Sequence, residues 1–517
     1  MSALVRDIVI TGGGTAGWLS AAIIASRVMG DKTKDFRVIV VESPDVPTIG
    51  VGEGTWPSMR STLKKVGIRE TDLVNNCDAS FKQGTHFFNW QSDAKSYTHP
   101  FTPPVLHSGE SIAEYMDPDD WPTAFDLAVC TQSHLFENHR APKLISTPEY
   151  AGITNYGYHF DAAKMVSLLK NHCKEKLRVE HILATVLDIE TDPSGNIMSL
   201  RTDRAGSVTG DFFIDCSGML GLIIDKLHGV QWLDKGEHLF NDTALAIQVP
   251  YRNEDSPIAS ATLSTAQKAG WIWDIGLSSR RGIGYVYSSQ HSSDEQSLNT
   301  LAEYLKGQAE LALLDKFEPR KITFSPGYRE RFWVKNSVAI GLSQGFVEPL
   351  EASALILVEQ SAWTIANLLP QAKELLPIVG RKFNELFEEK WRQIIDFLKM
   401  HYVTSQRQES YWLDHRSPSS MHQDVADRLK LWRERPPRDD DFHLKDELFP
   451  PASYQYVLYG MGFIPRWQSF SKSTDIEDHS VHADYSKVFK QAQKLKAGLT
   501  SNRHLLGQIR SLGLKKI

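Results

Sequence analysis

The first forty residues combine an apolar run, a glycine-rich turn and an apolar helical pattern. Residues 7–11 are a β-branched run that predicts a buried strand, and residues 12–17 read G-x-G-x-x-G. Apolar positions from Trp18 to about Met29 predict a helix, and residues 37–41 predict a second strand that ends at Glu42. This order of elements predicts a βαβ unit with a parallel sheet.

Two later stretches repeat the combination of a β-branched strand and a glycine-rich turn. They cover residues 180–230 and 335–365 and, together with residues 5–60, predict one α/β unit. The chain between them would then form insertions that build a second subdomain. We expect an α/β fold with a Rossmann-like sheet and an intermixed second subdomain that is partly helical at the C-terminus.

The C-terminal part of the chain is helical in pattern from about Leu375. Residues 433–441 are polar and interrupted by proline, which predicts an exposed loop, and the lysine-rich end predicts a solvated helix face. One apolar stripe with spacings of three and four consists of Phe383, Phe387, Trp391, Ile394 and Leu398.

These patterns predict two parts of the chain. An α/β body over residues 1–373 would carry inserted β segments at about 85–180 and 230–330, and a mainly helical region would cover residues 374–517. A chain of 517 residues is long enough for two or more subdomains.

Net charge and cysteine spacing narrow the class of protein. The net charge is −6 without a long basic run, so nothing indicates binding to nucleic acid or to an anionic membrane. We see no apolar stretch long enough to span a bilayer and no signal-peptide pattern at the N-terminus. The four cysteines lie far apart without a C-x-x-C pair, which indicates neither a zinc site nor a disulfide framework. A reducing cytoplasm is the expected compartment.

The glycine-rich turn after the first strand predicts a dinucleotide site. Gly12 permits the tight turn, Gly14 lets the backbone approach a pyrophosphate at the helix N-terminus, and Gly17 permits close packing of the helix on the strand. Glu42 lies where a ribose-binding carboxylate is expected, which argues against the 2′-phosphate of NADP.

Two further strand ends favour FAD as the dinucleotide. Residues 214–218 end a strand with Asp and Gly, and residues 337–341 end another strand ahead of a helix. FAD is a long dinucleotide with an isoalloxazine ring, and it needs contacts from strand ends beyond the first glycine-rich turn. Each segment on its own also fits a plain strand–turn connection.

Other segments carry candidate chemistry, each with a plainer alternative. Residues 50–57 contain three glycines and predict either a loop that covers a ligand or a simple connector ahead of a helix. Lys82 lies in an aromatic stretch, where it is either a surface lysine with a buried stem or a semi-buried amine with a lowered pKa.

A pair of tryptophans and a pair of glutamates can also have either a chemical or a purely structural role. Trp271 and Trp273 would share one face of a strand, as a wall or as core aromatics, and residues 281–287 predict the strand that pairs with it. Glu348 and Glu351 lie near a helix start, where acids are favoured by the helix dipole even without a chemical role.

Taken together, these segments resemble the flavin-dependent tryptophan halogenase family through most of the chain. The motifs are G-G-G-T-A-G-W, G-V-G-E-G-T-W-P, S-F-K and F-x-N-W around Lys82, W-x-W-x-I and F-V-E-P-L-E. Later positions that also match are Phe397, His401, Tyr402, Arg407, Tyr411 and Trp412. Lys82, the tryptophan pair and F-V-E-P-L-E, in that order, form a specific combination.

The resemblance implies an FAD-dependent halogenase. Reduced FAD, supplied by a separate flavin reductase, would react with oxygen and with chloride or bromide to give hypohalous acid. Lys82 would direct the halogen to one carbon of an aromatic ring, and Glu351 would stabilise the cationic ring and accept its proton. Trp271 and Trp273 would keep the substrate away from the flavin.

The resemblance also implies contacts for each ligand. Halide would lie at the backbone N–H groups of Ser353 and Ala354, and the substrate would contact His99, Phe101 and Tyr454. No metal is expected, and the family implies a homodimer. The expected FAD contacts are Gly12, Gly14, Thr15, Ala16, Gly17, Glu42, Gly52, Glu53, Gly54, Thr55, Val186, Asp215, Gly218, Gly341 and Leu342.

The chain departs from the family pattern in three places. Gly276 replaces a proline after the second tryptophan, and residues 352–354 read Ala-Ser-Ala where the family has S-T-G. The hydroxyl at 352 is therefore missing, and Ala354 disfavours the positive φ that glycine would permit. Residues 454–462 lack the adjacent tyrosines and acid that would hold free tryptophan. A bare indole, a phenol or a larger indolic compound is therefore at least as well supported as a substrate.

Two other functions remain open at this point. An FAD-dependent aromatic hydroxylase would share the dinucleotide motifs but would not need Lys82 or the tryptophan wall. It would usually bind NAD(P)H itself, and we find no second nucleotide motif. A flavin-binding sensor without catalysis would leave Lys82 and Glu351 far apart or closed off from solvent.

Overall fold

The computed structural model describes residues 4–30, 36–46, 52–107, 110–111, 124–306, 318–442, 447–463 and 475–516. The chain divides into two compact units, each built from three segments. The first unit contains Met1–Ala79, Phe160–Asp234 and Ser325–Trp391, and the second contains Ser80–His159, Lys235–Phe324 and Arg392–Ile517. The three stretches predicted as one α/β unit all fall in the first unit. The predicted division at residue 373 stays a prediction.

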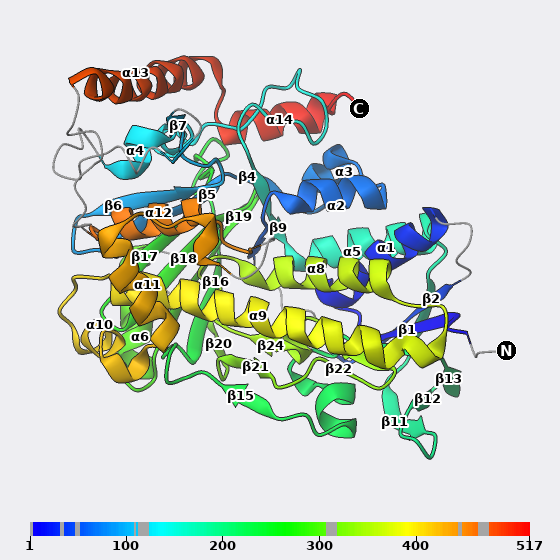
Figure 1. Cartoon of the computed structure of the whole chain (residues 1–517). Helices are drawn as coiled ribbons and strands as arrows, with labels where there is room; N and C mark the ends of the chain where they lie inside the picture. The colour runs from blue at the N-terminus through cyan, green and yellow to red at the C-terminus, as the bar shows by residue number, and fades with distance from the viewer. Residues whose placement is uncertain are drawn as a thin grey trace. The chain divides into compact units, whose positions relative to one another are not determined.

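A six-stranded sheet forms the centre of the first unit, and Figure 1 labels its strands β1, β2 and β22. The five strands from β10 to β23 run parallel, and β22 pairs antiparallel with β23. In the central strands β1, β2 and β14 the apolar residues are buried on both faces, as in parallel sheets covered on both sides, which confirms the α/β prediction. In order the strands are β10 Glu180–Leu183, β2 Arg37–Glu42, β1 Asp7–Thr11, β14 Phe212–Asp215, β23 Ser337–Ala339 and β22 Trp333–Val334.

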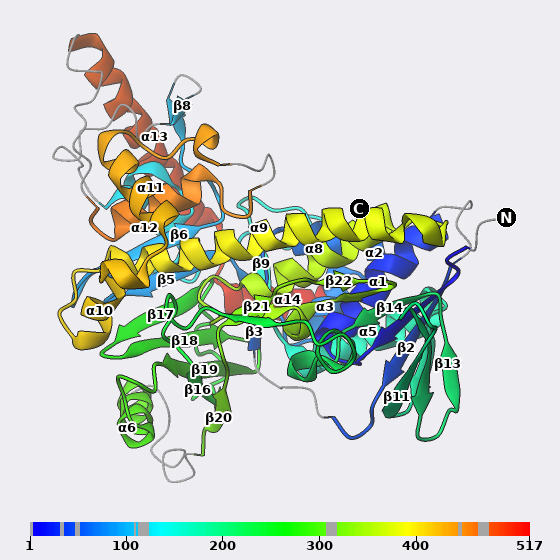
Figure 2. The ribbon, with the colours of Figure 1, turned by 60° about the horizontal axis from the view of Figure 1, so that its bottom comes forward.

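Different layers cover the two faces of this sheet. On one face α1 (Thr15–Gly30) packs between α5 (Ala162–Lys176) and α8 (Ser353–Leu368). On the other face lies a small sheet of β11 (Val186–Thr191), β12 (Ile197–Thr202) and β13 (Ser207–Thr209), visible in Figure 2. The buried residues between the two sheets are Val9, Ile39, Val41, Ile197, Leu200, Val208, Phe213 and Ile223.

Shorter elements complete the first unit. Residues 50 and 51 of the predicted glycine-rich loop lie outside the described residues, and its remainder forms β3 and leads into α2. The elements are β3 Gly52–Gly54, α2 Ser58–Val66, α3 Glu70–Asn76, and a sheet of β15 Trp232–Asp234, β21 Gly327–Arg329 and β24 Gly345–Phe346.

A seven-stranded sheet forms the centre of the second unit. All its pairings are antiparallel except that of β17 with β5. The predicted partner of the tryptophan strand is present as β19. In order the strands are β20 Arg320–Thr323, β16 Thr243–Pro250, β19 Arg280–Tyr287, β18 Gly270–Gly276, β17 Thr262–Gln267, β5 Gly84–Phe88 and β6 Ser96–Pro100.

Helices and short strands surround this sheet. Helix α6 (Asp294–Leu305) packs on one face through Leu301 and Leu305, beside β16 and β19 (Figure 2). The other elements are β4 Ser80–Lys82, β9 Gly157–Asp161, β7 Leu106–His107, β8 Glu110–Ser111, α4 Phe125–Val129, α10 Ser410–His415, α11 Gln423–Glu434, α12 Pro451–Gly460, α13 Asp475–Gly498 and α14 Asn502–Leu512. Within the described ranges, no helix is long and apolar enough to cross a membrane.

The segment at 433–441 agrees in part with the predicted exposed loop, because Arg433, Glu434, Arg438, Asp439 and Asp440 are exposed and residues 435–438 are irregular. Helix α11 continues to Glu434, and Pro436 and Pro437 are buried. The Asp441 carboxylate accepts a hydrogen bond from Trp432 Nε1 at 2.8 Å and forms an ion pair with Arg435. These local contacts fold the segment back onto its own helix.

The predicted apolar stripe lies on α9, which spans Leu376–Val403, and all five of its residues are buried. In the first unit, Phe387 stacks on Phe383 with ring centroids 4.3 Å apart. We expect Phe387→Ala to lower the free energy of unfolding by about 3–5 kcal/mol, because it leaves a cavity among aromatic rings. Chemical denaturation measures this value. The exposed neighbour Glu385→Ala should change it by less than about 0.5 kcal/mol, and a similar loss in both variants would contradict the prediction.

Candidate active site

The glycine turn between β1 and α1 is packed against backbone on one side and open on the other. Gly12 has φ +114°, and a Cβ there would lie 2.2 Å from the carbonyl oxygen of Cys216. A Cβ on Gly17 would lie 1.9 Å from the carbonyl oxygen of Gly12. Around Gly14, by contrast, no described atom lies within 4 Å of the Cβ position. The fold therefore requires Gly12 and Gly17, whereas Gly14 faces open space at the N-terminus of α1, where a pyrophosphate fits.

Three strand ends meet beside this turn. The N–H of Cys216, after β14, donates to the carbonyl of Thr11 at the end of β1 at 2.8 Å. The N–H of Ile340, after β23, donates to the carbonyl of Asp215 at 2.9 Å. A Cβ on Gly341 (φ +75°) would lie 2.8 Å from the Cβ of Ala16. The carboxyl edge of the parallel sheet thus gathers the expected contacts from β1, β14 and β23, as in nucleotide-binding α/β folds.

The Asp215 carboxylate holds the turn that follows β14. It accepts hydrogen bonds from Ser217 N at 3.0 Å, Ser217 Oγ at 2.6 Å, Ile223 N at 2.8 Å and Ile224 N at 2.9 Å. The side chain is fully buried. Its contribution here is therefore to shape the turn around Gly218, and its contact with a cofactor sugar stays a prediction.

Glu42 at the end of β2 is also engaged within the protein. Its carboxylate lies 3.0 Å from Lys170 Nζ and 2.9 Å from His181 Nε2. Burial lowers the pKa of His181, although Glu42 opposes that shift. Lys170 is thus the charge partner of Glu42, and a ribose hydroxyl at this carboxylate would share it with two protein groups. Val186, another expected contact, packs against the apolar cluster between the two sheets.

The glycine-rich segment after β2 carries a carboxyl with a shifted pKa. Burial raises the pKa of Glu53 to about 7, and the nearby Asp161 carboxylate adds to the shift. Asp161 caps α5 by accepting a hydrogen bond from Lys164 N at 3.1 Å. Gly54 is half-buried and Thr55 is buried, so this segment is packed into the first unit.

Glu351 precedes α8 in a turn with unusual backbone geometry. Its side chain is buried, and its carbonyl accepts a hydrogen bond from Trp56 Nε1 at 2.8 Å. The positive φ falls on Ala352 (φ 54°), whereas Ser353 and Ala354 begin the helix. The concern about a positive φ at Ala354 was therefore misplaced by two residues, because the left-handed position is the N-cap of α8. Backbone N–H groups at 353 and 354 belong to the first helical turn, which favours anions.

Lys82 lies in the second unit and is not a surface lysine. Its side chain is 2% exposed, with Nζ 5.5 Å from the ring centroid of Phe101. In the β4–β9 pair Lys82 lies opposite Gly157, and Ser80 lies opposite His159, so Lys82 and His159 share one face. The pKa of His159 is well below its usual value because of burial and the charge of Lys82. Sequence reasoning missed His159, although a histidine inside the apolar strand at 157–161 was a visible signal.

Two of the expected substrate residues, His99 and Tyr454, belong to an aromatic cluster of the second unit. His99 Nε2 lies 3.0 Å from Ser453 Oγ, and the His99 ring is 5.9 Å from that of Phe397. The Phe397 ring is in turn 4.9 Å from that of Tyr454. Tyr454 is fully buried, with Trp432 and Phe442 also against it. His99 and Phe101 keep partial exposure, and the contact of Tyr454 with a substrate stays a prediction.

Trp271 and Trp273 lie on one face of β18 with ring centroids 6.3 Å apart. Gly284 lies opposite Trp273 on β19, and a Cβ there would be 2.0 Å from the Trp273 indole. Sequence reasoning missed Gly284, although its spacing in R-G-I-G-Y was a signal of close approach. The six-membered ring of Trp273 therefore occupies the space that a side chain at Gly284 of the neighbouring strand would need.

Trp90 packs against Trp271 and Trp412. Its ring lies 6.2 Å from that of Trp271 and 5.4 Å from that of Trp412. Trp90 Nε1 donates to the carbonyl of Ser264 at 3.2 Å. His401, Tyr402 and Trp412, which match the family pattern, therefore contact Trp90, and Trp90 in turn contacts Trp271. This packing explains why these motifs occur together in one chain.

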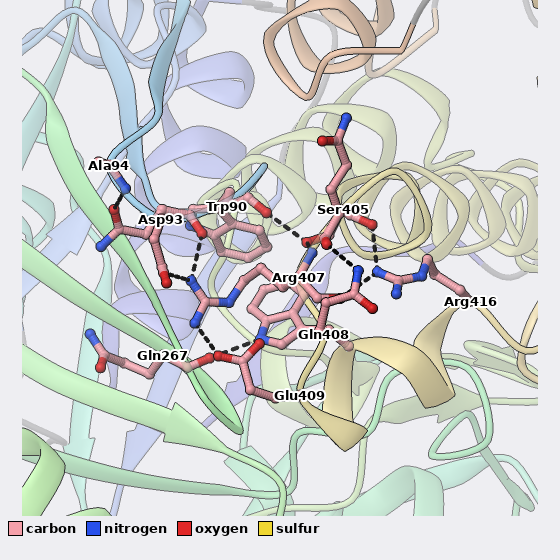
Figure 3. A network of polar contacts seen from close by, with 12 residues as sticks. Trp90, Asp93, Ala94, Gln267, Ser405, Arg407, Gln408, Glu409 and Arg416 are labelled. Carbon is pink, nitrogen blue, oxygen red and sulfur yellow. Dashed lines mark hydrogen bonds and ion pairs between the residues drawn. The ribbon is translucent and has the colours of Figure 1, made fainter.

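Figure 3 shows the polar network beside Trp90. Ser405 Oγ donates to the Trp90 carbonyl at 2.7 Å, and the Arg407 guanidinium donates to the Asn89 carbonyl at 3.1 Å. Arg407 also pairs with Asp93 at 2.7 Å and with Glu409. This network fixes the backbone on both sides of Trp90. Among the described residues, no group of three or more His, Cys, Asp or Glu could hold a metal ion.

The parallel sheet with its glycine turn defines the first unit as a nucleotide-binding α/β fold. The family described as tryptophan halogenase matches residues 7–475 of the chain. Tryptophan 7-halogenase RebH from Lentzea aerocolonigenes is 30% identical over 495 residues, which cover 90% of this chain and 91% of RebH.

Solved structures agree with this match. A tryptophan halogenase from Shewanella frigidimarina NCIMB 400 is 45% identical, covers 99% of both chains and has a TM-score of 0.95. BrvH, a flavin-dependent halogenase from Brevundimonas sp. BAL3, is 29% identical, covers 98% of this chain and 99% of its own, and has a TM-score of 0.85. The chain belongs to the tryptophan halogenase family and is a flavin-dependent halogenase, which confirms the resemblance in its motifs.

Substitution by alanine tests the difference between Gly14, which faces open space, and Gly17, which is packed against backbone. We expect Gly14→Ala to fold normally and to weaken FAD binding about tenfold or more, because its methyl group enters the open space at the helix N-terminus. Gly17→Ala should destabilise the unliganded protein by about 1–3 kcal/mol or prevent folding, because its Cβ meets the Gly12 carbonyl. Thermal unfolding and flavin fluorescence titration separate the two effects. Normal FAD affinity in a folded Gly14→Ala variant would contradict the assignment.

A buried carboxyl on α8 predicts a pH dependence of stability. Burial raises the pKa of Glu359 to about 7, although hydrogen bonds from Thr62 and Ser58 and the charge of Lys65 oppose the shift. The folded state therefore binds this proton more tightly than the unfolded state, and stability falls as the pH rises from about 4.5 through 7. Relative to wild type, Glu359→Gln should gain about 2 kcal/mol of stability between pH 5 and pH 8. Urea unfolding at the two pH values measures this, and the exposed Glu388→Gln should show no such trend.

Proposed function

We propose that this halogenase acts on an electron-rich aromatic ring of the indole type. Lys82 would deliver the halogen, and Glu351 would stabilise the cationic ring and accept its proton. The observation that carries the proposal is the 2% exposure of Lys82 beside the Phe101 ring. Lysine is seldom fully buried, and a buried amine with aromatic neighbours at one strand is a costly arrangement that a chemical role accounts for.

FAD, when bound, would supply the oxidising chemistry that turns halide into hypohalous acid. The Lys82 amine would hold the acid by a hydrogen bond, or it would exchange one N–H proton for the halogen and release water. In either case the halogen would then pass to one ring carbon. His159 would add to the site by remaining neutral, because its burial and the Lys82 charge both lower its pKa. A neutral neighbour does not compete with Lys82 for the negative end of the oxidant.

Glu351 would act on the ring after halogen transfer. A carboxylate close to the cationic ring stabilises its charge, and the same group can accept the proton that leaves the substituted carbon. Trp271 and Trp273 would separate substrate from flavin, held in place by Gly284 and Trp90.

The substrate is proposed from the residues that keep exposure. His99 and Phe101 are half-buried, whereas Tyr454 is enclosed by Phe397, Trp432 and Phe442. We therefore propose an indole, a phenol or a larger indolic compound as the substrate, alongside tryptophan, which the name of RebH gives as its substrate. We further propose that a separate flavin reductase supplies reduced FAD and that the enzyme is a homodimer, both from the family resemblance.

The role of Lys82 predicts a separation of two activities. Purified enzyme, FAD, a flavin reductase, NADH and bromide or chloride would be incubated with a panel of indoles and phenols, and products read by mass spectrometry. Lys82→Met should lower formation of the halogenated product by about 100-fold or more. It should still produce hypohalous acid, detected with a small-molecule trap, because the amine acts after the oxidant forms. Lys95→Met, at an exposed lysine of the same unit, is the matched control.

The same assay separates the alternatives. A halogenated product that persists in Lys82→Met would overturn the delivery role. A hydroxylated product that forms without halide and survives the substitution would favour an aromatic hydroxylase instead.

A further inference from the structure

The glycine-rich segment and the Glu351 turn are joined by one hydrogen bond within the first unit. Trp56 directly follows Gly52–Thr55, and its Nε1 donates to the carbonyl oxygen of Glu351 at 2.8 Å. The two residues are 295 positions apart in the chain. The indole N–H therefore links the segment expected to cover the cofactor to the residue expected to serve the substrate.

The turn that carries Glu351 contains a strained residue at the N-cap of α8. Ala352 adopts left-handed geometry (φ 54°, ψ 41°), which costs an alanine about 1–2 kcal/mol. Ala352 is also the N-cap of α8 and offers no side-chain hydrogen bond, although Ser, Thr, Asp or Asn usually caps a helix. A bond from Ala352 N to the Pro349 carbonyl at 3.1 Å closes the turn locally. The contact from Trp56 acts on the peptide that joins Glu351 to this strained residue.

Helices α2 and α8 are held together farther along by separate contacts. Glu359 accepts hydrogen bonds from Thr62 Oγ1 at 2.9 Å and Ser58 Oγ at 3.2 Å. Trp363 Nε1 donates to Thr62 Oγ1 at 2.9 Å. The hydrogen bond of Trp56 thus lies just before the first residues of α2 and α8. Trp363 makes a hydrogen bond of the same kind, also through its indole N–H, about three helical turns away from Glu351.

We propose that Trp56 is a positioning residue that sets the direction of the Glu351 side chain and links it to the Gly52–Thr55 segment. Holding the Glu351 carbonyl fixes the peptide plane between Glu351 and Ala352. This fixes the direction of the Glu351 Cα–Cβ bond relative to α8, from which the side-chain torsions place the carboxylate. The inference rests on the proposed function of Glu351. The position of the Gly52–Thr55 segment and the direction of the carboxylate are then coupled through one hydrogen bond.

The chain offers a matched pair of variants. Trp56→Phe and Trp363→Phe each keep an aromatic ring and remove one indole N–H donor between α2 and the α8 region. Both should therefore lose a similar, small amount of stability in thermal unfolding. Amide hydrogen exchange over residues 352–356, measured without cofactor, tests the link independently of catalysis. Exchange there should rise about fivefold in Trp56→Phe and stay at the wild-type rate in Trp363→Phe.

Catalysis provides the second readout. In the halogenation assay Trp56→Phe should lower kcat about tenfold with little change in KM for the aromatic substrate, while Trp363→Phe behaves as wild type. In a Glu351→Gln background, Trp56→Phe should have no further effect, because Trp56 acts through that carboxylate.

Each outcome decides one question. Unchanged exchange in Trp56→Phe, or a loss of kcat that is just as large in the Glu351→Gln background, would overturn the positioning role. A wild-type enzyme that halogenates no member of the panel would count against the proposed function, whereas the exchange measurement would still decide whether Trp56 holds the turn.

Discussion

Two carbonyl oxygens press against Gly12 and Gly17 so closely that neither position can carry a side chain. This close approach brings α1 down onto the end of β1 and brings the chain after β14 against the same turn. The rest of the carboxyl edge depends on it, because Ala16, Cys216 and Gly341 lie near one another only while that spacing is kept. Gly14 stands apart, since no atom of the described chain requires it to be glycine. The protein thus reserves the space in front of α1, and a negatively charged group is what a helix N-terminus attracts there.

The parts that sequence reasoning predicted well were those set by local pattern. The strand at 7–11, the helix after it and the strand ending at Glu42 follow from apolar runs buried on both faces, and the stripe on α9 follows from helical spacing. The site was less predictable where tertiary contacts decide. The local pattern left Lys82 either at the surface or semi-buried, because its burial depends on Phe101 and on a strand 75 residues later that places Gly157 opposite it. Likewise, the sequence pattern does not indicate that Asp441 pairs back to Arg435 or that the left-handed residue is Ala352.

The two units use different means to hold chemical groups in place. In the first unit the expected cofactor contacts come from strand ends and backbone, and side chains such as Asp215 are consumed in shaping turns. In the second unit Lys82 and the tryptophan pair come from strands, with rings packed behind them and Arg407 securing the backbone around Trp90. Groups on strands with packed neighbours lose little conformational entropy during a reaction, which suits the proposed transfer of halogen to one ring carbon.

The absence of a side chain at Gly284 makes room for an indole that belongs to another strand. The W-x-W pattern therefore carries information about a residue eleven positions downstream of Trp273, in the partner strand. When uncharacterised chains are screened for such a wall, W-x-W followed by a larger residue at that register describes a pair whose second ring must turn away from the sheet. The glycine is thus a better diagnostic than the tryptophans alone, because two tryptophans can belong to any core, whereas the glycine records that one of them lies across the strand.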